Sequence, residues 1–130
     1  MMETTALLVT ALLFGGMVLY AFGFAAFMLN ALPADIARPT IRLAFPHFYL
    51  FVIGAASLGA VLLAIQDALA AAIMAAIALT TAPTRQILMP AINAATDAGL
   101  KRRFRVLHGL SVLITLVHIL ATGLVLSRFV

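Results

Sequence analysis

Long apolar runs dominate the chain, and they predict four membrane-spanning helices. The runs cover roughly residues 4–29, 45–65, 68–89 and 106–126. A helix rises about 1.5 Å per residue, so each run can cross a hydrocarbon core of about 30 Å. None of them alternates apolar and polar residues as the strands of a membrane barrel do. The pattern predicts an all-α fold, with residues 1–130 forming a single transmembrane domain, a four-helix bundle.

The composition agrees with a membrane-embedded chain. Hydrophobic residues make up 65% of it and charged residues 9%, and the mean hydropathy is +1.21. These values lie outside the usual range of soluble domains. The first run follows Met1-Met2-Glu3, which has no basic side chain, and it is longer than the core of a signal peptide. We therefore expect it to be retained as a span.

The basic residues gather on one side of the predicted bundle. Arg38 and Arg42 fall between the first two spans, whereas Arg128 is alone near the other side. The end of the third span and the connection after it hold Arg85, Lys101, Arg102, Arg103 and Arg105. The positive-inside rule then predicts that both termini are non-cytoplasmic. Anionic lipid at this basic face accounts for a pI of about 10.8 without a nucleic acid partner.

Small residues and prolines predict how the helices pack and bend. Ala55 and Gly59 form a small-xxx-small pair on the second span, which favours a close helix crossing. Pro83 has no N–H to donate within the third span, so we expect the third helix to be kinked near this residue.

The fourth span carries a stripe of polar side chains. Its members are His108, Ser111, Thr115, His118 and Thr122. At about 100° per residue they fall within roughly an 80° arc, which should face the bundle interior. Two interpretations stay open. The stripe is either a packing seam, with hydroxyls bonded to their own helix, or a polar pathway that includes His118 as its ionisable group.

A second group of polar residues is expected at the cytoplasmic edge. Its candidate members are His47, Arg85, Met89, Asn93 and Asp97, with His108 at the same depth. They would form either a ligand site or a set of interfacial anchors with an ion pair from Asp97 to a basic neighbour.

Aromatic residues also gather at this level. They are Phe22, Phe24 and Phe27 on the first span and Phe45, Phe48, Tyr49 and Phe51 on the second. Aromatic side chains are enriched at membrane interfaces, so we expect an interfacial belt.

Several short stretches carry a resemblance to a known family. They are Gly16-Met17, residues 22–27, Leu32-Pro33, Phe45-Pro46, Pro83 with Met89, and Phe104 through His108-Gly109-Leu110-Ser111 to Gly123. In these the chain resembles the transmembrane-protein-205-like family, whose function is unknown and which has bacterial and animal members. The resemblance implies a four-span membrane protein, and we expect this chain to be a bacterial member in the inner membrane. In animals the family is linked to resistance against platinum drugs.

This chain departs from the family in its sulfur chemistry. It has no cysteine, and Thr115 stands where the family has a polar Asn. Handling of soft metals by thiolates therefore does not carry over. The thioethers of Met17, Met28, Met74 and Met89 would be weaker ligands.

Three classes of function remain open. The first is a transport or export-associated protein, although no Asp or Glu lies inside a span to couple cations. The second is a membrane-organising protein, either a homo-oligomer or an accessory and assembly subunit of a larger membrane complex. The third is a haem or copper protein that uses His47 and His108. The sequence lacks a recognisable catalytic motif, so we expect no enzyme activity and no resident cofactor or metal.

Overall fold

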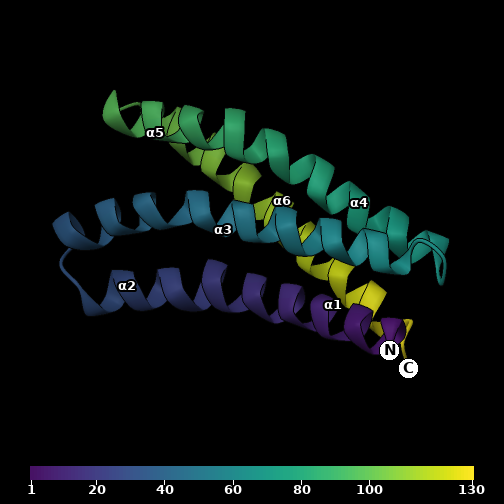
Figure 1. The fold of residues 1–130 in the computed structure, drawn as a ribbon. Coiled ribbons are helices and arrows are strands. Elements are labelled where there is room, and N and C mark those ends of the chain that lie inside the picture. The colour runs from purple at the N-terminus through teal and green to yellow at the C-terminus, as the bar shows by residue number, and fades with distance from the viewer.

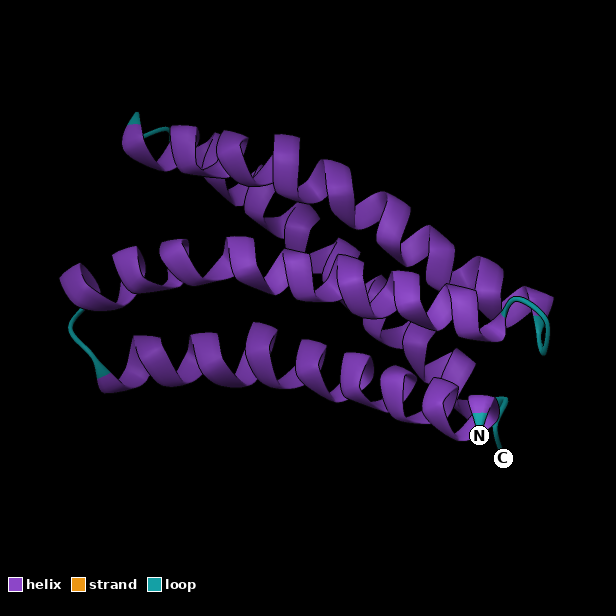
Figure 2. Cartoon of the chain, viewed as in Figure 1, coloured by secondary structure: helices purple, strands orange, loops and turns teal.

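The computed structural model describes residues 1–130 and is helical throughout, apart from short turns and the chain ends (Figure 1 and Figure 2). Its elements are α1 (Met2–Val18), η1 (Leu19–Phe24), α2 (Ala25–Ala31), α3 (Ala34–Leu63), α4 (Ala68–Pro83), η2 (Thr84–Leu88), α5 (Met89–Asp97) and α6 (Lys101–Ser127). They join into four spans, Met2–Ala31, Ala34–Leu63, Ala68–Asp97 and Lys101–Ser127, each long and apolar enough to cross a membrane. The predicted four-helix fold is confirmed.

The spans run alternately up and down the bundle. Figure 1 shows the α2–α3 and α5–α6 connections at one end, and both termini with the α3–α4 turn at the other. The second span packs between the first and the third, and α6 crosses behind them to contact α1, α4 and α5.

The helices extend beyond the apolar runs. The α3 helix begins at Ala34 rather than near residue 45, so Arg38 and Arg42 lie within a helix and not in a loop. The α6 helix likewise begins at Lys101, which removes most of the predicted connection. An apolar run marks the part of a helix that lies in the hydrocarbon, whereas the helix itself can continue into the polar headgroup region. The predicted loop positions were wrong for this reason.

The third span is irregular where the sequence predicts it to be. The α4 helix ends at Pro83, and a π-helical turn over Thr84–Leu88 follows before α5 resumes. Because Pro83 cannot donate to the preceding turn, a local change in the hydrogen-bond register is a natural response. A second π-helical segment, η1, contains no proline and was not predicted.

The core lies where the four spans meet. Its largest fully buried apolar side chains are Leu13, Met17, Val52, Met74, Ile77 and Val125. Gly59 is buried against Met74, and a Cβ added at Gly59 would overlap the Met74 Cε atom. The α3 and α4 helices therefore cross closely at the small-residue pair, as predicted.

Replacing Gly59 with leucine should destabilise the protein by about 1–3 kcal/mol, because the larger side chain would force α3 and α4 apart. Gly54 provides the matched control, since a Cβ at this position meets nothing within 4 Å. Unfolding in mixed micelles, followed by circular dichroism, measures both variants. Equal stability of Gly59→Leu and Gly54→Leu would contradict the close crossing.

Candidate functional site

The polar stripe of α6 faces the bundle interior over most of its length. Ser111, Thr115, His118 and Thr122 are buried, and His118 retains only 8% of its accessible surface. His108 differs from them, because it is exposed and its ring stacks on Phe104 at a centroid distance of 5.2 Å.

The hydroxyl groups of the stripe bond to carbonyls of α6 itself. Ser111 Oγ donates to His108 O at 2.7 Å, and Thr115 Oγ1 donates to Ser111 O at 3.1 Å. Thr122 Oγ1 donates to His118 O at 2.7 Å. Each hydroxyl has therefore used its only hydrogen within its own helix, which is the arrangement of a packing seam.

His118 is the member of the stripe that reaches another span. Its Nε2 lies 2.8 Å from Thr80 Oγ1 on α4. Thr80 Oγ1 also lies 2.7 Å from Ala76 O, which can only accept a hydrogen bond. The Thr80 hydrogen is directed to that carbonyl, so His118 Nε2 carries the proton and donates to Thr80. Thr80 was not predicted to bond to His118, although the similar depth of the two residues in their spans was a usable signal.

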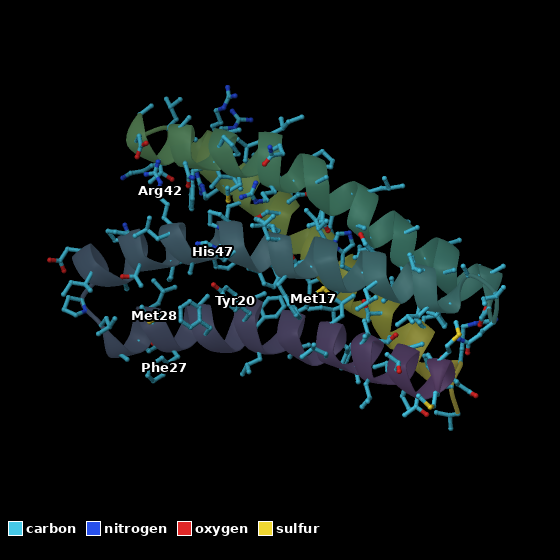
Figure 3. All side chains as sticks on the ribbon, in the orientation of Figure 1. Met17, Tyr20, Phe27, Met28, Arg42 and His47 are labelled. Atoms are coloured by element: carbon cyan, nitrogen blue, oxygen red, sulfur yellow. The ribbon has the colours of Figure 1, made fainter.

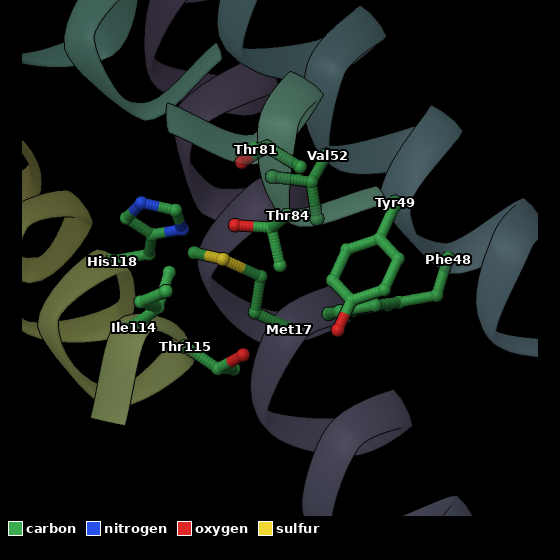
Figure 4. A pocket seen from close by; sticks show the side chains of 9 residues that line it. All are labelled: Met17, Phe48, Tyr49, Val52, Thr81, Thr84, Ile114, Thr115 and His118. Carbon is green, nitrogen blue, oxygen red and sulfur yellow. The ribbon is translucent and has the colours of Figure 1, made fainter. Parts of the chain in front are cut away.

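A small cavity lies beside His118 at the meeting point of all four spans (Figure 4). It is lined by Met17, Phe48, Tyr49, Val52, Thr81, Thr84, Ile114, Thr115 and His118. Its volume is about 10 Å³, the space of a single water molecule.

A much larger groove opens on the outside of the bundle, between the first span and α3. Its volume is about 700 Å³, and it is lined by Leu12, Gly16, Leu19, Tyr20, Gly23, Phe24, Phe27, His47, Phe48 and Phe51. Figure 3 labels Tyr20 and Phe27 on the first span and His47 on α3. This face of the molecule is apolar and has no covering helix within the chain.

The predicted cytoplasmic-edge cluster divides into separate contacts. Arg85 Nε donates to Pro46 O at 3.2 Å, and its Nη1 donates to Gln86 Oε1 at 2.6 Å. His47 follows Pro46 in the chain but lines the groove toward the first span. Met89 packs against the core, and Asn93 makes no side-chain hydrogen bond within the chain. The structure therefore does not unite these residues in one hydrogen-bonded cluster, although Arg85 and Asp97 both bond to α3.

Comparison with known families identifies the family of the chain. The family model described as a domain of unknown function, DUF4149, matches residues 8–101. The chain belongs to the DUF4149 family. No curated protein and no solved structure matches it. The four apolar helices identify this DUF4149 member as an integral membrane protein. The matched region contains the groove and Thr80, whereas the α6 stripe lies after it.

Ion pairs join the spans of this DUF4149 protein at both ends of the bundle. Arg42 donates to both carboxylate oxygens of Asp97, at 2.7 and 2.8 Å, which ties α3 to α5. Arg128 pairs with Asp67, which also caps α4 by accepting from the Ala70 N–H at 3.1 Å. Arg42 is thus the basic neighbour of Asp97. Both pairs are largely exposed, so each contributes little to stability.

The pairing of Asp67 with Arg128 depends on pH in a defined direction. The Arg128 guanidinium and the Ala70 N–H lower the pKa of the Asp67 carboxyl below its ordinary value. A carboxyl with a lowered pKa stabilises the folded state at neutral pH. That stabilisation is lost as the pH falls through the lowered pKa.

Part of the aromatic group forms a packed cluster, whereas Phe22 and Phe27 of the predicted belt are exposed. The rings of Tyr20 and Phe48 stack at 5.1 Å, and Phe45 lies edge-on to both at 5.8 and 5.5 Å. Phe48 and Tyr49 are buried, which corrects the prediction that they belong to a belt. Tyr20 Oη donates to Ala44 O at 2.8 Å and links the first span to α3. Tyr20 was not singled out from the sequence.

Replacing Thr80 with valine should destabilise this DUF4149 protein by about 1 kcal/mol, the typical size of an interhelical hydrogen bond in a membrane bundle. The variant leaves the His118 Nε2–H without its acceptor. Thr10→Val is the control, because Thr10 Oγ1 bonds only to Ala6 O of its own helix. Reversible unfolding in micelles compares the two. A loss that is no larger for Thr80→Val than for Thr10→Val would contradict the assigned bond.

Proposed function

We propose that this DUF4149 chain is a non-enzymatic, membrane-organising protein that packs laterally against a transmembrane helix of another membrane protein. The observation that carries the proposal is the open apolar groove of about 700 Å³ between the first span and α3. The partner helix would fill this groove within the membrane, so that the chain acts as an accessory or assembly subunit of a larger complex.

The walls of the groove suit a helix. Gly23 lies in the groove on the first span, and a Cβ added there would meet only Leu19 of the same span, whereas Gly16 already packs against Phe51 of α3. A glycine such as Gly23 allows the backbone of a second helix to approach closely, which is how helices associate in lipid. Within its most apolar stretch, the first span also has the smallest share of buried residues of the four, 17%. It therefore has the most surface to offer a partner.

A transport role has less support from the interior of the bundle. The internal cavity takes about 10 Å³, and the hydroxyls of Ser111, Thr115 and Thr122 are bonded within α6. A conducting pathway would need polar groups that are free to bind a passing solute. The haem alternative likewise has little support, since His47 faces the groove while His108 stacks on Phe104.

Filling the groove should weaken the association. Gly23→Leu places a side chain in it, whereas Gly15→Leu adds the same side chain at an exposed glycine of the same helix, where a Cβ meets nothing within 4 Å. Tagged variants are purified from native membranes in mild detergent, and co-purifying proteins are quantified by mass spectrometry. We expect Gly23→Leu to reduce a stoichiometric partner on the order of tenfold, a loss of about 1.4 kcal/mol.

Two results would count against this function. The first is an unchanged set of proteins with Gly23→Leu. The second is a tightly bound lipid that disappears with Gly23→Leu while no protein does, because the groove would then hold an acyl chain rather than a helix.

The orientation of the chain is a further part of the proposal. We place the basic end, with anionic lipid around it, in the cytoplasm of a bacterium and both termini outside it, and we regard the chain as a relative of the transmembrane-protein-205-like family. The bias of Lys and Arg toward the end formed by the α2–α3 and α5–α6 connections supports this placement.

Single cysteines test the orientation directly, because the chain has none of its own. We expect a membrane-impermeant maleimide to label Gln66→Cys in intact cells and Arg103→Cys only after the membrane is opened. Gln66 lies at the α3–α4 turn and Arg103 near the start of α6, so the two mark opposite ends of the bundle. The reverse labelling pattern would show the opposite orientation.

A further inference from the structure

The threonines around the cavity beside His118 present only hydrogen-bond acceptors to it. Thr81 Oγ1 donates to Ile77 O at 2.6 Å, and Thr84 Oγ1 donates to Thr80 O at 2.8 Å. Thr115 Oγ1 donates to Ser111 O at 3.1 Å. A hydroxyl has one hydrogen, so each of these oxygens faces the cavity with lone pairs alone. The three threonines therefore cannot bond to one another across it.

The imidazole of His118 adds a fourth acceptor. Its Nε2 donates to Thr80, and a neutral imidazole carries its proton on one nitrogen only, so Nδ1 is left with a lone pair. In Figure 4 one ring nitrogen of His118 is turned toward Thr84, on the cavity side. Thr80 does not line the cavity, so this nitrogen is Nδ1. It has no hydrogen-bond partner within the chain.

From these contacts we propose that the cavity is a binding site for one water molecule, which donates its hydrogens to His118 Nδ1 and to a threonine oxygen. The volume of about 10 Å³ matches one water, and the site offers the two or more polar partners that a buried water needs. No carboxylate lines the cavity to balance a cation. A neutral donor therefore fits better than an ammonium or metal ion.

The water supplies the hydrogens that the three threonine oxygens and His118 Nδ1 lack. It bridges α6 to Thr81 of α4 or to Thr84, the first residue of the π-helical turn. Thr80, His118 and the water then form one hydrogen-bonded unit that fixes the third span against the fourth. This role is independent of the groove and of any partner that the groove binds.

Nuclear magnetic resonance of the full chain in lipid nanodiscs tests the site. Histidine is labelled with ¹⁵N, and the His118 signals are distinguished from those of His47 and His108 by their absence in His118→Gln. We expect a neutral His118 with its proton on Nε2, together with magnetisation transfer from water to the His118 ring. We expect at least one of Thr81→Val, Thr84→Val and Thr115→Val to reduce that transfer at least threefold. Thr122→Val should not, because Thr122 is buried on α6 outside the cavity.

Either of two results in the wild-type protein would overturn the proposal. They are a proton on Nδ1 and the absence of any water contact at the ring. Unchanged water transfer in all three of Thr81→Val, Thr84→Val and Thr115→Val would overturn it as well. If those variants do not fold, the tautomer and the water contact of the wild-type protein decide the question without them.

Discussion

The structure depends on one constraint: polar groups inside a bilayer must find their partners within the protein. The threonine and serine hydroxyls along α6 meet it by donating to carbonyls of their own helix, as do Thr81 and Thr84 on the third span. Such bonds satisfy the hydroxyl but join nothing across the bundle. Between the two ends of the bundle, the link between Thr80 and His118 is the only hydrogen bond that joins side chains of two spans. Tyr20 and Arg85 bond instead to backbone carbonyls of α3, and the two ion pairs lie at the ends.

Close packing of side chains must hold the spans together otherwise, because helices in lipid are not driven together by the hydrophobic effect. The α3 helix carries most of these contacts. It meets α4 closely at Gly59, and its aromatic residues pack against Tyr20 of the first span. The outer face of the first span has no equivalent cover, which leaves the groove open to the membrane. Groove and interior thus have different roles, since the interior holds the bundle together and the groove can accept a neighbour.

The sequence predicted the features that follow from local chemistry. Four apolar runs define four spans, Pro83 precedes a π-helical turn, and Gly59 marks a close crossing. The helix ends were wrong, since polar residues such as Arg42 continue a helix beyond the hydrocarbon. The hydrophobic pattern does not contain that information.

Contacts between spans were the least predictable part of the site. The periodicity of α6 gives the direction of His118 relative to its own helix but does not show that Thr80 lies opposite it. In the same way, the sequence places Arg85 and Asp97 near the end of the third span but does not show that Asp97 pairs with Arg42 and that Arg85 bonds to the backbone at Pro46. Rotation and tilt of neighbouring helices decide such pairs, and these depend on packing over the whole bundle.

The central claim is that the groove receives a helix of another protein, and photo-crosslinking in native membranes tests it most directly. A photoreactive phenylalanine analogue replaces Phe27, an exposed residue of the groove, or Leu79, an equally exposed residue of α4 outside it. We expect a discrete protein adduct from position 27 and none from position 79. Lipid adducts alone at both positions would contradict it.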